Sequence, residues 1–205
     1  KTILKFMKYS ITIILLTLIF SSQTHTSYGQ NVKKAYFASG CFWCVESIYE
    51  NLKGVKEVDS GYSGGFVENP SYYQVISGRT GHAEAIEVIY DPNLIDFKTL
   101  VKVFFGSHDP STLNRQGPDV GTHYRSIAFY DSKEEKDIIE KEIKKLLDNK
   151  IHSLITTEVL KFKKFYRAEE YHQDYKKKNP YDNYIMKVSN PRISKFKMDF
   201  KEIIK

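Results

Sequence analysis

Apolar residues recur along the chain at two spacings, which indicate which segments form strands and which form helices. Short alternating or continuous apolar runs predict strands over residues 34–39, 55–62, 82–90, 125–130 and 156–160. Apolar positions three and four residues apart predict helices over residues 41–52, 96–106, 133–147 and 168–177. Because the two types of element alternate, we expect an α+β fold in which helices pack on one mixed sheet.

Two long segments are expected to be loops. Residues 66–81 are polar and aromatic, and residues 109–123 are rich in Asp, Gly and Pro. Long loops inside a compact domain usually carry function. The sequence contains no internal repeat, no low-complexity linker and no Gly-rich dinucleotide motif. We therefore expect a single domain with functional residues on these loops.

The first 29 residues have the pattern of a secretory signal peptide. Three lysines precede an uncharged run of ten residues, Ile11–Phe20, which is too short to span a membrane. A small-x-small pattern at residues 27–29 predicts cleavage before Gln30. The alternative is that residues 1–29 remain as an uncleaved membrane anchor. Either way we expect an exported protein, periplasmic or otherwise extracytoplasmic.

The composition is that of a globular protein: the chain has 205 residues, 41% of them hydrophobic and 27% charged. The net charge of +6 is unevenly distributed, because residues 30–175 sum to −3 and residues 176–205 to +6. A mildly acidic body disfavours nucleic-acid binding, which needs a basic face on the folded surface. We therefore expect a domain over residues 30–185, followed by a basic C-terminal tail, residues 186–205, that stays solvated.

The sharpest local feature is the pair Cys41 and Cys44, which lies where a strand passes into a helix. Unpaired amides at a helix N-terminus stabilise an anion, so we expect a lowered thiol pKa at Cys41. Cys44 lies one turn further on, about 5–6 Å away between Cβ atoms by helical geometry, so a disulfide can form. The alternatives are a buried inert pair and half of a zinc site. Zinc needs two further ligands, and the histidines are scattered, so redox chemistry is favoured.

Phe42 and Trp43 separate the two cysteines. Bulky aromatic side chains beside a nucleophile form an apolar pocket for a small group, whereas disulfide exchange needs a more open surface. Two other functions remain open at this point. One is a thiol–disulfide oxidoreductase that uses the CxxC pair, and the other is a non-enzymatic exported module that binds a ligand in the aromatic pocket.

A series of short motifs runs in order from about Lys34 to Tyr181. The motifs are Gly40–Trp43 with Val45-Glu46, Gly61–Gly65, Asn69–Tyr72, Thr80–Ala85, Tyr90–Pro92, His108–Pro110, Arg115–Gly117, Asp119–Thr122, Tyr124–Ser126 and Ala168–Gln173. Each motif is weak alone, but the ordered set is very specific. On these motifs the chain resembles the peptide methionine sulfoxide reductases of the A type.

This resemblance implies a ferredoxin-like core and a catalytic site. It implies that Cys41 attacks the sulfur of a methionine sulfoxide, while Glu84 supplies a proton with help from the hydroxyls of Tyr72 and Tyr124. A sulfoxide sulfur is a poor electrophile until its oxygen is protonated or strongly hydrogen-bonded. Glu84 must then be protonated at rest, which a semi-apolar aromatic pocket would favour by desolvation.

The resemblance also implies the surroundings and partners of the reaction. Phe42 and Trp43 would hold the substrate S-methyl group, Asp119 would support the site by hydrogen bonding, and His172 and Tyr175 would lie near its C-terminal wall. The substrates would be oxidised proteins, peptides and free methionine sulfoxide, with the S configuration at sulfur. The enzyme would be monomeric, use no metal or organic cofactor, and take its electrons from thioredoxin or a similar dithiol.

The second cysteine departs from the family pattern. Many members have Gly where this chain has Cys44, and their recycling cysteines lie near the C-terminus, where this chain has none. Either Cys44 resolves the Cys41 sulfenic acid as a disulfide, or an external thiol recycles the enzyme.

Overall fold

The computed structural model describes residues 31–205. The leader expected over residues 1–29 and its cleavage before Gln30 therefore lie outside the described residues. No helix within residues 31–205 is long and apolar enough to cross a membrane.

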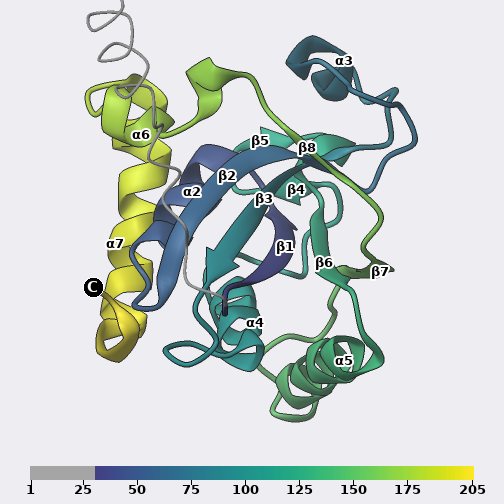
Figure 1. Cartoon of the computed structure of the whole chain (residues 1–205), viewed down its shortest axis with the longest axis vertical. Helices are drawn as coiled ribbons and strands as arrows, with labels where there is room; N and C mark the ends of the chain where they lie inside the picture. The colour runs from purple at the N-terminus through teal and green to yellow at the C-terminus, as the bar shows by residue number, and fades with distance from the viewer. Residues whose placement is uncertain (1–30) are drawn as a thin grey trace, which may run out of the picture. The chain divides into compact units, whose positions relative to one another are not determined.

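The framework is a six-stranded sheet in the order β7-β6-β1-β3-β2-β8 (Figure 1). Its strands are β1 (Lys33–Ser39), β2 (Val55–Ser63), β3 (Ala83–Tyr90), β6 (Ser126–Tyr130), β7 (Glu158–Lys161) and β8 (Phe165–Arg167). Neighbouring strands are antiparallel, except that β7 is parallel to β6. The four central strands, in the order β6-β1-β3-β2 with helices after β1 and β3, form the expected ferredoxin-like core. The prediction of an α+β fold is confirmed.

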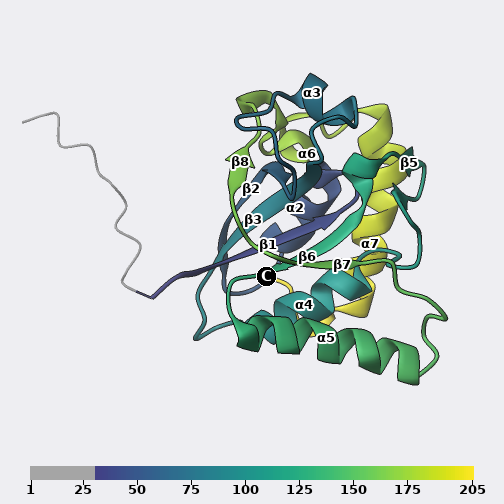
Figure 2. The ribbon, with the colours of Figure 1, turned by 90° about the vertical axis from the view of Figure 1, so that its right-hand side faces the viewer.

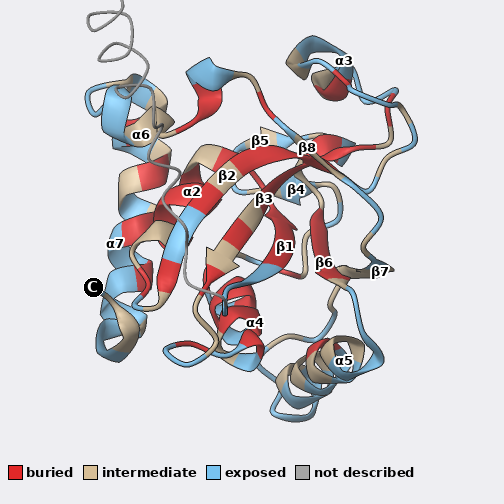
Figure 3. Ribbon diagram, in the orientation of Figure 1, coloured by how far each residue is buried: buried red, intermediate tan, exposed pale blue. Residues whose placement is uncertain are grey.

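One face of the sheet carries the larger part of the core. The helices α2 (Phe42–Glu50) and α4 (Phe97–Gly106) pack on this face, and α5 (Lys133–Asp148) packs on α4. Phe37 of β1 joins the layers, because its ring stacks 5.4 Å from that of Tyr49 and 5.3 Å from that of Phe104. Figure 3 shows buried residues concentrated along the central strands and on α2. The chain between β7 and β8 covers the other face, where Phe162 stacks on Tyr36 at 3.6 Å.

The two segments expected to be loops contain short regular elements. Helix α3 (Tyr72–Ile76) lies in the first, and its first turn is closed by a capping box between Ser71 and Gln74. The second contains the hairpin of β4 (Arg115–Gln116) and β5 (Asp119–Val120), followed by a 3₁₀ turn, Thr122–Tyr124.

The helix predicted over residues 168–177 is wrong. This segment forms a 3₁₀ turn, Glu170–His172, and the short helix α6 (Tyr175–Lys178), separated by an extended Gln173 and by Asp174 at φ +54°. The cause is the buried amide of Gln173, which accepts from the backbone N–H of Ser60 and donates to its carbonyl, both at 2.9 Å. These two bonds to β2 outweigh the local helical preference of the segment.

The solvated tail predicted over residues 186–205 is also wrong, and so is the end of the domain at residue 185. A π-helical turn, Ile185–Ser189, leads into α7 (Asn190–Asp199) and a 3₁₀ turn, Lys201–Ile203. Ile193 and Phe196 are buried in the core, and α7 runs alongside α2 in both views (Figures 1 and 2). The lysines of the segment occupy its exposed face, so the charge run is one side of an amphipathic helix.

Candidate active site

A cavity of about 240 Å³ lies where the N-terminus of α2 meets β3, the two long loops and residues 168–205, which we call the C-terminal segment. Seven of the eight residues predicted for the site line it: Cys41, Phe42, Trp43, Tyr72, Glu84, Asp119 and Tyr124. The eighth, Cys44, is buried one turn behind Cys41. The structure therefore brings together residues that span more than eighty positions of the sequence.

The turn from β1 into α2 determines where Cys41 lies. Gly40 has φ +88°, and a Cβ at this position would stand 2.6 Å from the Cβ of Gln116, so only glycine fits. Cys41 is the N-cap of α2, and its carbonyl accepts from the N–H groups of Cys44 and Val45 at 3.1 and 3.3 Å. The thiol of Cys41 accepts no capping hydrogen bond from the helix. The amide of Phe42 instead donates to Glu84.

Glu84 is a buried carboxyl group held by one hydrogen bond. It lies in β3 opposite Tyr62, is 2% exposed, and accepts from the Phe42 N–H at 3.0 Å. Burial raises the pKa of Glu84 to about 8, and the negative charges of Asp119 and Cys44 act in the same direction, against the lowering effect of the Phe42 amide. The group is therefore a neutral carboxylic acid at pH 7 and can donate a proton into the cavity.

Tyr72 and Tyr124 add two phenolic hydroxyls to the cavity. Burial, with the charges of Glu84 and Cys41, raises the pKa of Tyr72 to about 12, and the same causes raise the pKa of Tyr124. Both side chains therefore remain protonated donors at neutral pH. Glu169, which sequence reasoning missed, positions Tyr72, because it accepts from the Tyr72 backbone N–H at 2.9 Å and from the Tyr62 hydroxyl at 2.8 Å.

The aromatic wall consists of Phe42, Trp43 and side chains from the C-terminal segment. The Trp43 ring stacks on Tyr175 at 3.7 Å, and its indole N–H donates to His172 at 3.2 Å. The His172 ring lies 4.9 Å from that of Phe42. His172 and Tyr175 are thus at the C-terminal wall, as expected. These stacked contacts fix an apolar surface that can hold a methyl group.

The pKa values of the two thiols differ from the expectation for Cys41. Burial, then the neighbouring Cys44 and the charge of Glu84, raise the pKa of Cys41 well above its usual value. The neighbouring Cys41, then the Arg192 charge and the contacts with Ser189 and Tyr184, outweigh the effect of burial and lower the pKa of Cys44 to about 6. Burial thus opposes the lowered pKa that the helix N-terminus led us to expect at Cys41.

The C-terminal segment supplies site residues that sequence reasoning missed. Tyr184 lines the cavity and donates from its hydroxyl to Asp119 at 2.5 Å, which places Asp119. Ser189 lies outside the cavity, with its Oγ 2.9 Å from the Cys44 Sγ. The apolar spacing of Ile185, Ile193 and Phe196 could have marked this segment as a packed helix, but its lysines dominated the interpretation.

Within residues 31–205, no group of three or more His, Cys, Asp or Glu side chains is arranged to hold a metal ion. The cavity combines a nucleophilic dithiol, a neutral carboxylic acid and an apolar wall. This arrangement suits a thiol-dependent reductase that protonates a small polar group while a sulfur attacks it.

Comparison with known proteins gives the family. Residues 33–203 match the family model described as peptide methionine sulfoxide reductase. A peptide methionine sulfoxide reductase MsrA of Trichodesmium erythraeum is 49% identical over 162 residues, which are 78% of this chain and 92% of that protein. The chain belongs to the peptide methionine sulfoxide reductase family.

Solved structures agree with this assignment. Mxr1 from Saccharomyces cerevisiae in its reduced form has a TM-score of 0.69 and 35% identity, covering 74% of this chain and 88% of that chain. Mxr1 in complex with Trx2 has a TM-score of 0.50 and 26% identity, covering 75% and 91%.

We predict that the rate of methionine release in a single turnover falls as the pH rises through about 8, where Glu84 ionises. Glu84→Gln keeps a hydrogen-bond donor but transfers no proton, so release should slow about 10²–10⁴-fold and lose this pH dependence, while the sulfoxide still binds. Glu46→Gln is the matched control, because burial also raises the pKa of Glu46 to about 8 but its side chain lies outside the cavity. A Glu84→Gln variant with the wild-type rate would remove Glu84 from the mechanism.

Proposed function

We propose that the cavity reduces the S epimer of methionine sulfoxide, in oxidised proteins, in peptides and as the free amino acid. The observation that carries this assignment is the neutral carboxyl group of Glu84, buried beside the Cys41 dithiol in a small cavity with an aromatic wall. Desolvation keeps the acid protonated at neutral pH, which is the state that a sulfoxide oxygen requires of its donor.

In the proposed reaction the substrate S-methyl group packs against Phe42 and Trp43. The sulfoxide oxygen faces Glu84 and the hydroxyls of Tyr72 and Tyr124. Cys41 attacks the sulfur, the oxygen passes to Cys41, and the products are methionine and a Cys41 sulfenic acid. The methionine sulfur gains two electrons and the Cys41 sulfur loses two. Asp119 accepts a hydrogen bond from the hydroxyl of Tyr184 and acts on the site through that residue.

The first test is stereochemical. Fixed positions for the methyl group and the oxygen make the cavity chiral, so only the S epimer of a methionine-sulfoxide peptide should be reduced with dithiothreitol. Cys41→Ser is the control and should abolish turnover, because a hydroxyl at neutral pH does not replace a thiol nucleophile. Chromatographic separation of the two epimers gives each rate, and equal reduction of both would contradict the assignment.

We propose further that Cys44 recycles the enzyme by forming a disulfide with Cys41, which thioredoxin or a similar dithiol then reduces. Cys44 lies one helical turn from Cys41, and the chain has no other cysteine. The complex of the related Mxr1 with Trx2 supports a reductant of this kind. All electrons in this cycle come from thiols, so no metal or organic cofactor takes part, and one copy of the chain supplies every group.

Cys44→Ser should still release about one methionine per enzyme in a single turnover without added reductant, but should lose turnover driven by thioredoxin, which needs a disulfide to attack. After one equivalent of substrate, mass spectrometry should show that the wild type has lost two hydrogens and that the variant has gained one oxygen. If the variant recycles with thioredoxin as fast as the wild type, an external thiol resolves the sulfenic acid and Cys44 is not required.

We propose that the enzyme works outside the cytoplasm, because of the leader pattern in residues 1–29. The native protein should begin near Gln30, and its intact mass in an extracytoplasmic fraction would measure this. Attachment to the membrane with residues 1–29 intact would favour the anchor alternative. A soluble cytoplasmic protein that retains those residues would contradict export.

A further inference from the structure

Ser189 has a buried hydroxyl whose partner is a sulfur atom. The residue is 0% exposed, and its Oγ lies 2.9 Å from the Sγ of Cys44. No other side-chain hydrogen bond of Ser189 occurs within residues 31–205. A buried hydroxyl without a partner is destabilising, so the contact with Cys44 explains why a serine is tolerated here.

The π-helical turn, Ile185–Ser189, brings two hydroxyls to the same sulfur. Tyr184, immediately before the turn, has its hydroxyl 4.0 Å from the Cys44 Sγ. In a regular α-helix, residues five apart point in directions roughly 140° from each other, at 3.6 residues per turn. The wider turn reduces this divergence, and such turns are frequent at functional sites. The local helix geometry thus places the hydroxyls of Tyr184 and Ser189 near Cys44.

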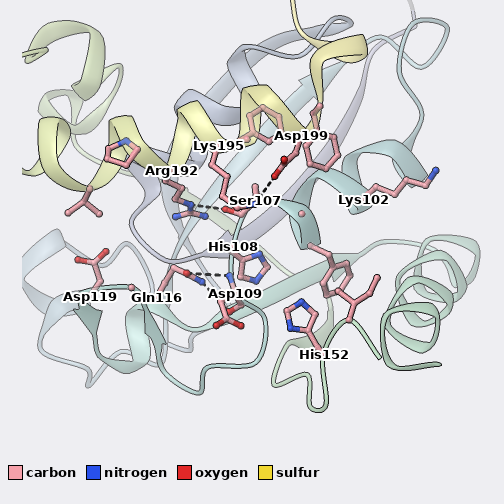
Figure 4. A pocket seen from close by; sticks show the side chains of 18 of the residues that line it. Lys102, Ser107, His108, Asp109, Gln116, Asp119, His152, Arg192, Lys195 and Asp199 are labelled. Carbon is pink, nitrogen blue, oxygen red and sulfur yellow. Dashed lines mark hydrogen bonds and ion pairs between the residues drawn. The ribbon is translucent and has the colours of Figure 1, made fainter. Parts of the chain in front are cut away.

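The positive charge of Arg192 also favours the ionised form of Cys44. Its Nε donates to the carbonyl of Ser107 at 2.8 Å and its Nη2 to that of Ser39 at 3.0 Å. Figure 4 shows the side chain reaching from α7 toward Ser107 along a cavity of about 980 Å³. Arg192 forms no salt bridge in the part of the chain that the structure describes, so no carboxylate neutralises its charge at short range.

The other charged and titratable groups around Cys44 act in both directions. Cys41, the N-cap of the same helix, favours the ionised form of Cys44, and the hydroxyl of Tyr184 lies 4.0 Å from the Cys44 Sγ. Glu84 from β3 lies close enough to interact with the Cys44 charge, but it is protonated at neutral pH. Asp119 is held by Tyr184 and also lies in the field of Arg192. The ionisation of Cys44 at neutral pH therefore depends on the residues of the C-terminal segment.

We infer that Ser189 is a positioning residue whose hydroxyl holds the Cys44 sulfur and stabilises its thiolate for attack on Cys41. This inference rests on the proposed Cys41–Cys44 disulfide. In the step concerned, the thiol of Cys44 gives up its proton, and the resulting thiolate attacks the sulfur of the Cys41 sulfenic acid and forms the S–S bond. The S–O bond breaks, and the departing hydroxide takes up a proton to give water. In formal oxidation states the Cys41 sulfur is lowered by one unit and the Cys44 sulfur is raised by one unit, so the step balances without a further oxidant or reductant.

The test separates this second step from the first. In Ser189→Ala, methionine release in a single turnover should keep the wild-type rate, while disulfide formation slows about tenfold, the effect of losing a hydrogen bond worth about 1.4 kcal/mol. Quenched samples analysed by mass spectrometry give both rates, because the sulfenic acid retains one oxygen and the disulfide does not. Ser194→Ala, at an exposed serine of α7, which follows the turn, is the matched control, and Ser189→Thr should restore the rate because it keeps the hydroxyl.

A second measurement reads the thiolate directly. In a Cys41→Ser background, the ultraviolet absorbance of the Cys44 thiolate follows its ionisation without requiring a reagent to reach the buried sulfur. The midpoint of this titration should shift upward by about one pH unit when Ser189 becomes Ala. An unchanged midpoint, or equal slowing of methionine release and disulfide formation, would overturn the inference. If the wild type itself forms no disulfide, the proposed recycling fails, and the titration alone then decides whether Ser189 stabilises the Cys44 thiolate.

Discussion

The site depends on one buried hydrogen bond, which the amide of Phe42 donates to the carboxyl group of Glu84. A carboxyl group that accepts several N–H donors becomes a strong acid, whereas one that is merely buried destabilises the fold by leaving polar atoms unpaired. A single donor satisfies one oxygen and leaves the pKa raised by burial. The register of β3 fixes this balance, because a shift by one residue would turn Glu84 to the opposite face of the sheet.

The same short stretch at the start of α2 serves every other part of the site. Phe42 supplies one aromatic ring and the amide that donates to Glu84. Cys41 supplies the nucleophile, and Trp43 supplies the surface on which the C-terminal segment stacks. The C-terminal segment therefore completes a site whose centre is formed by the first quarter of the described chain. It contains two 3₁₀ turns, a π-helical turn and short helices, which place individual side chains where a longer regular helix would not.

Periodicity and motifs predicted much of this, and the reasons for the failures are physical. The central strands, α2, α4 and α5 follow from local apolar spacing, because each buries one face. The segment over residues 168–177 was misassigned because the two bonds from Gln173 to Ser60 are made to a strand more than a hundred residues away, which local preference does not register. The segment after residue 185 was misassigned because its lysines outnumber the few apolar residues that bury it. Likewise, the helix N-terminus suggested a lowered pKa at Cys41, whereas burial, which depends on the tertiary packing, raises it.

The unequal exposure of the two thiols has a consequence for how a disulfide between them would be opened. Cys41 is 5% exposed and lines the cavity, whereas Cys44 is 0% exposed and lies behind it. An incoming thiol that enters through the cavity therefore reaches the Cys41 sulfur, and Cys44 is the leaving group. Leaving thiols of low pKa depart faster, so the groups that stabilise negative charge on Cys44 also favour its release. The mixed disulfide with the reductant would thus form on Cys41, the sulfur that accepts the substrate oxygen, and both halves of the cycle would use one entrance.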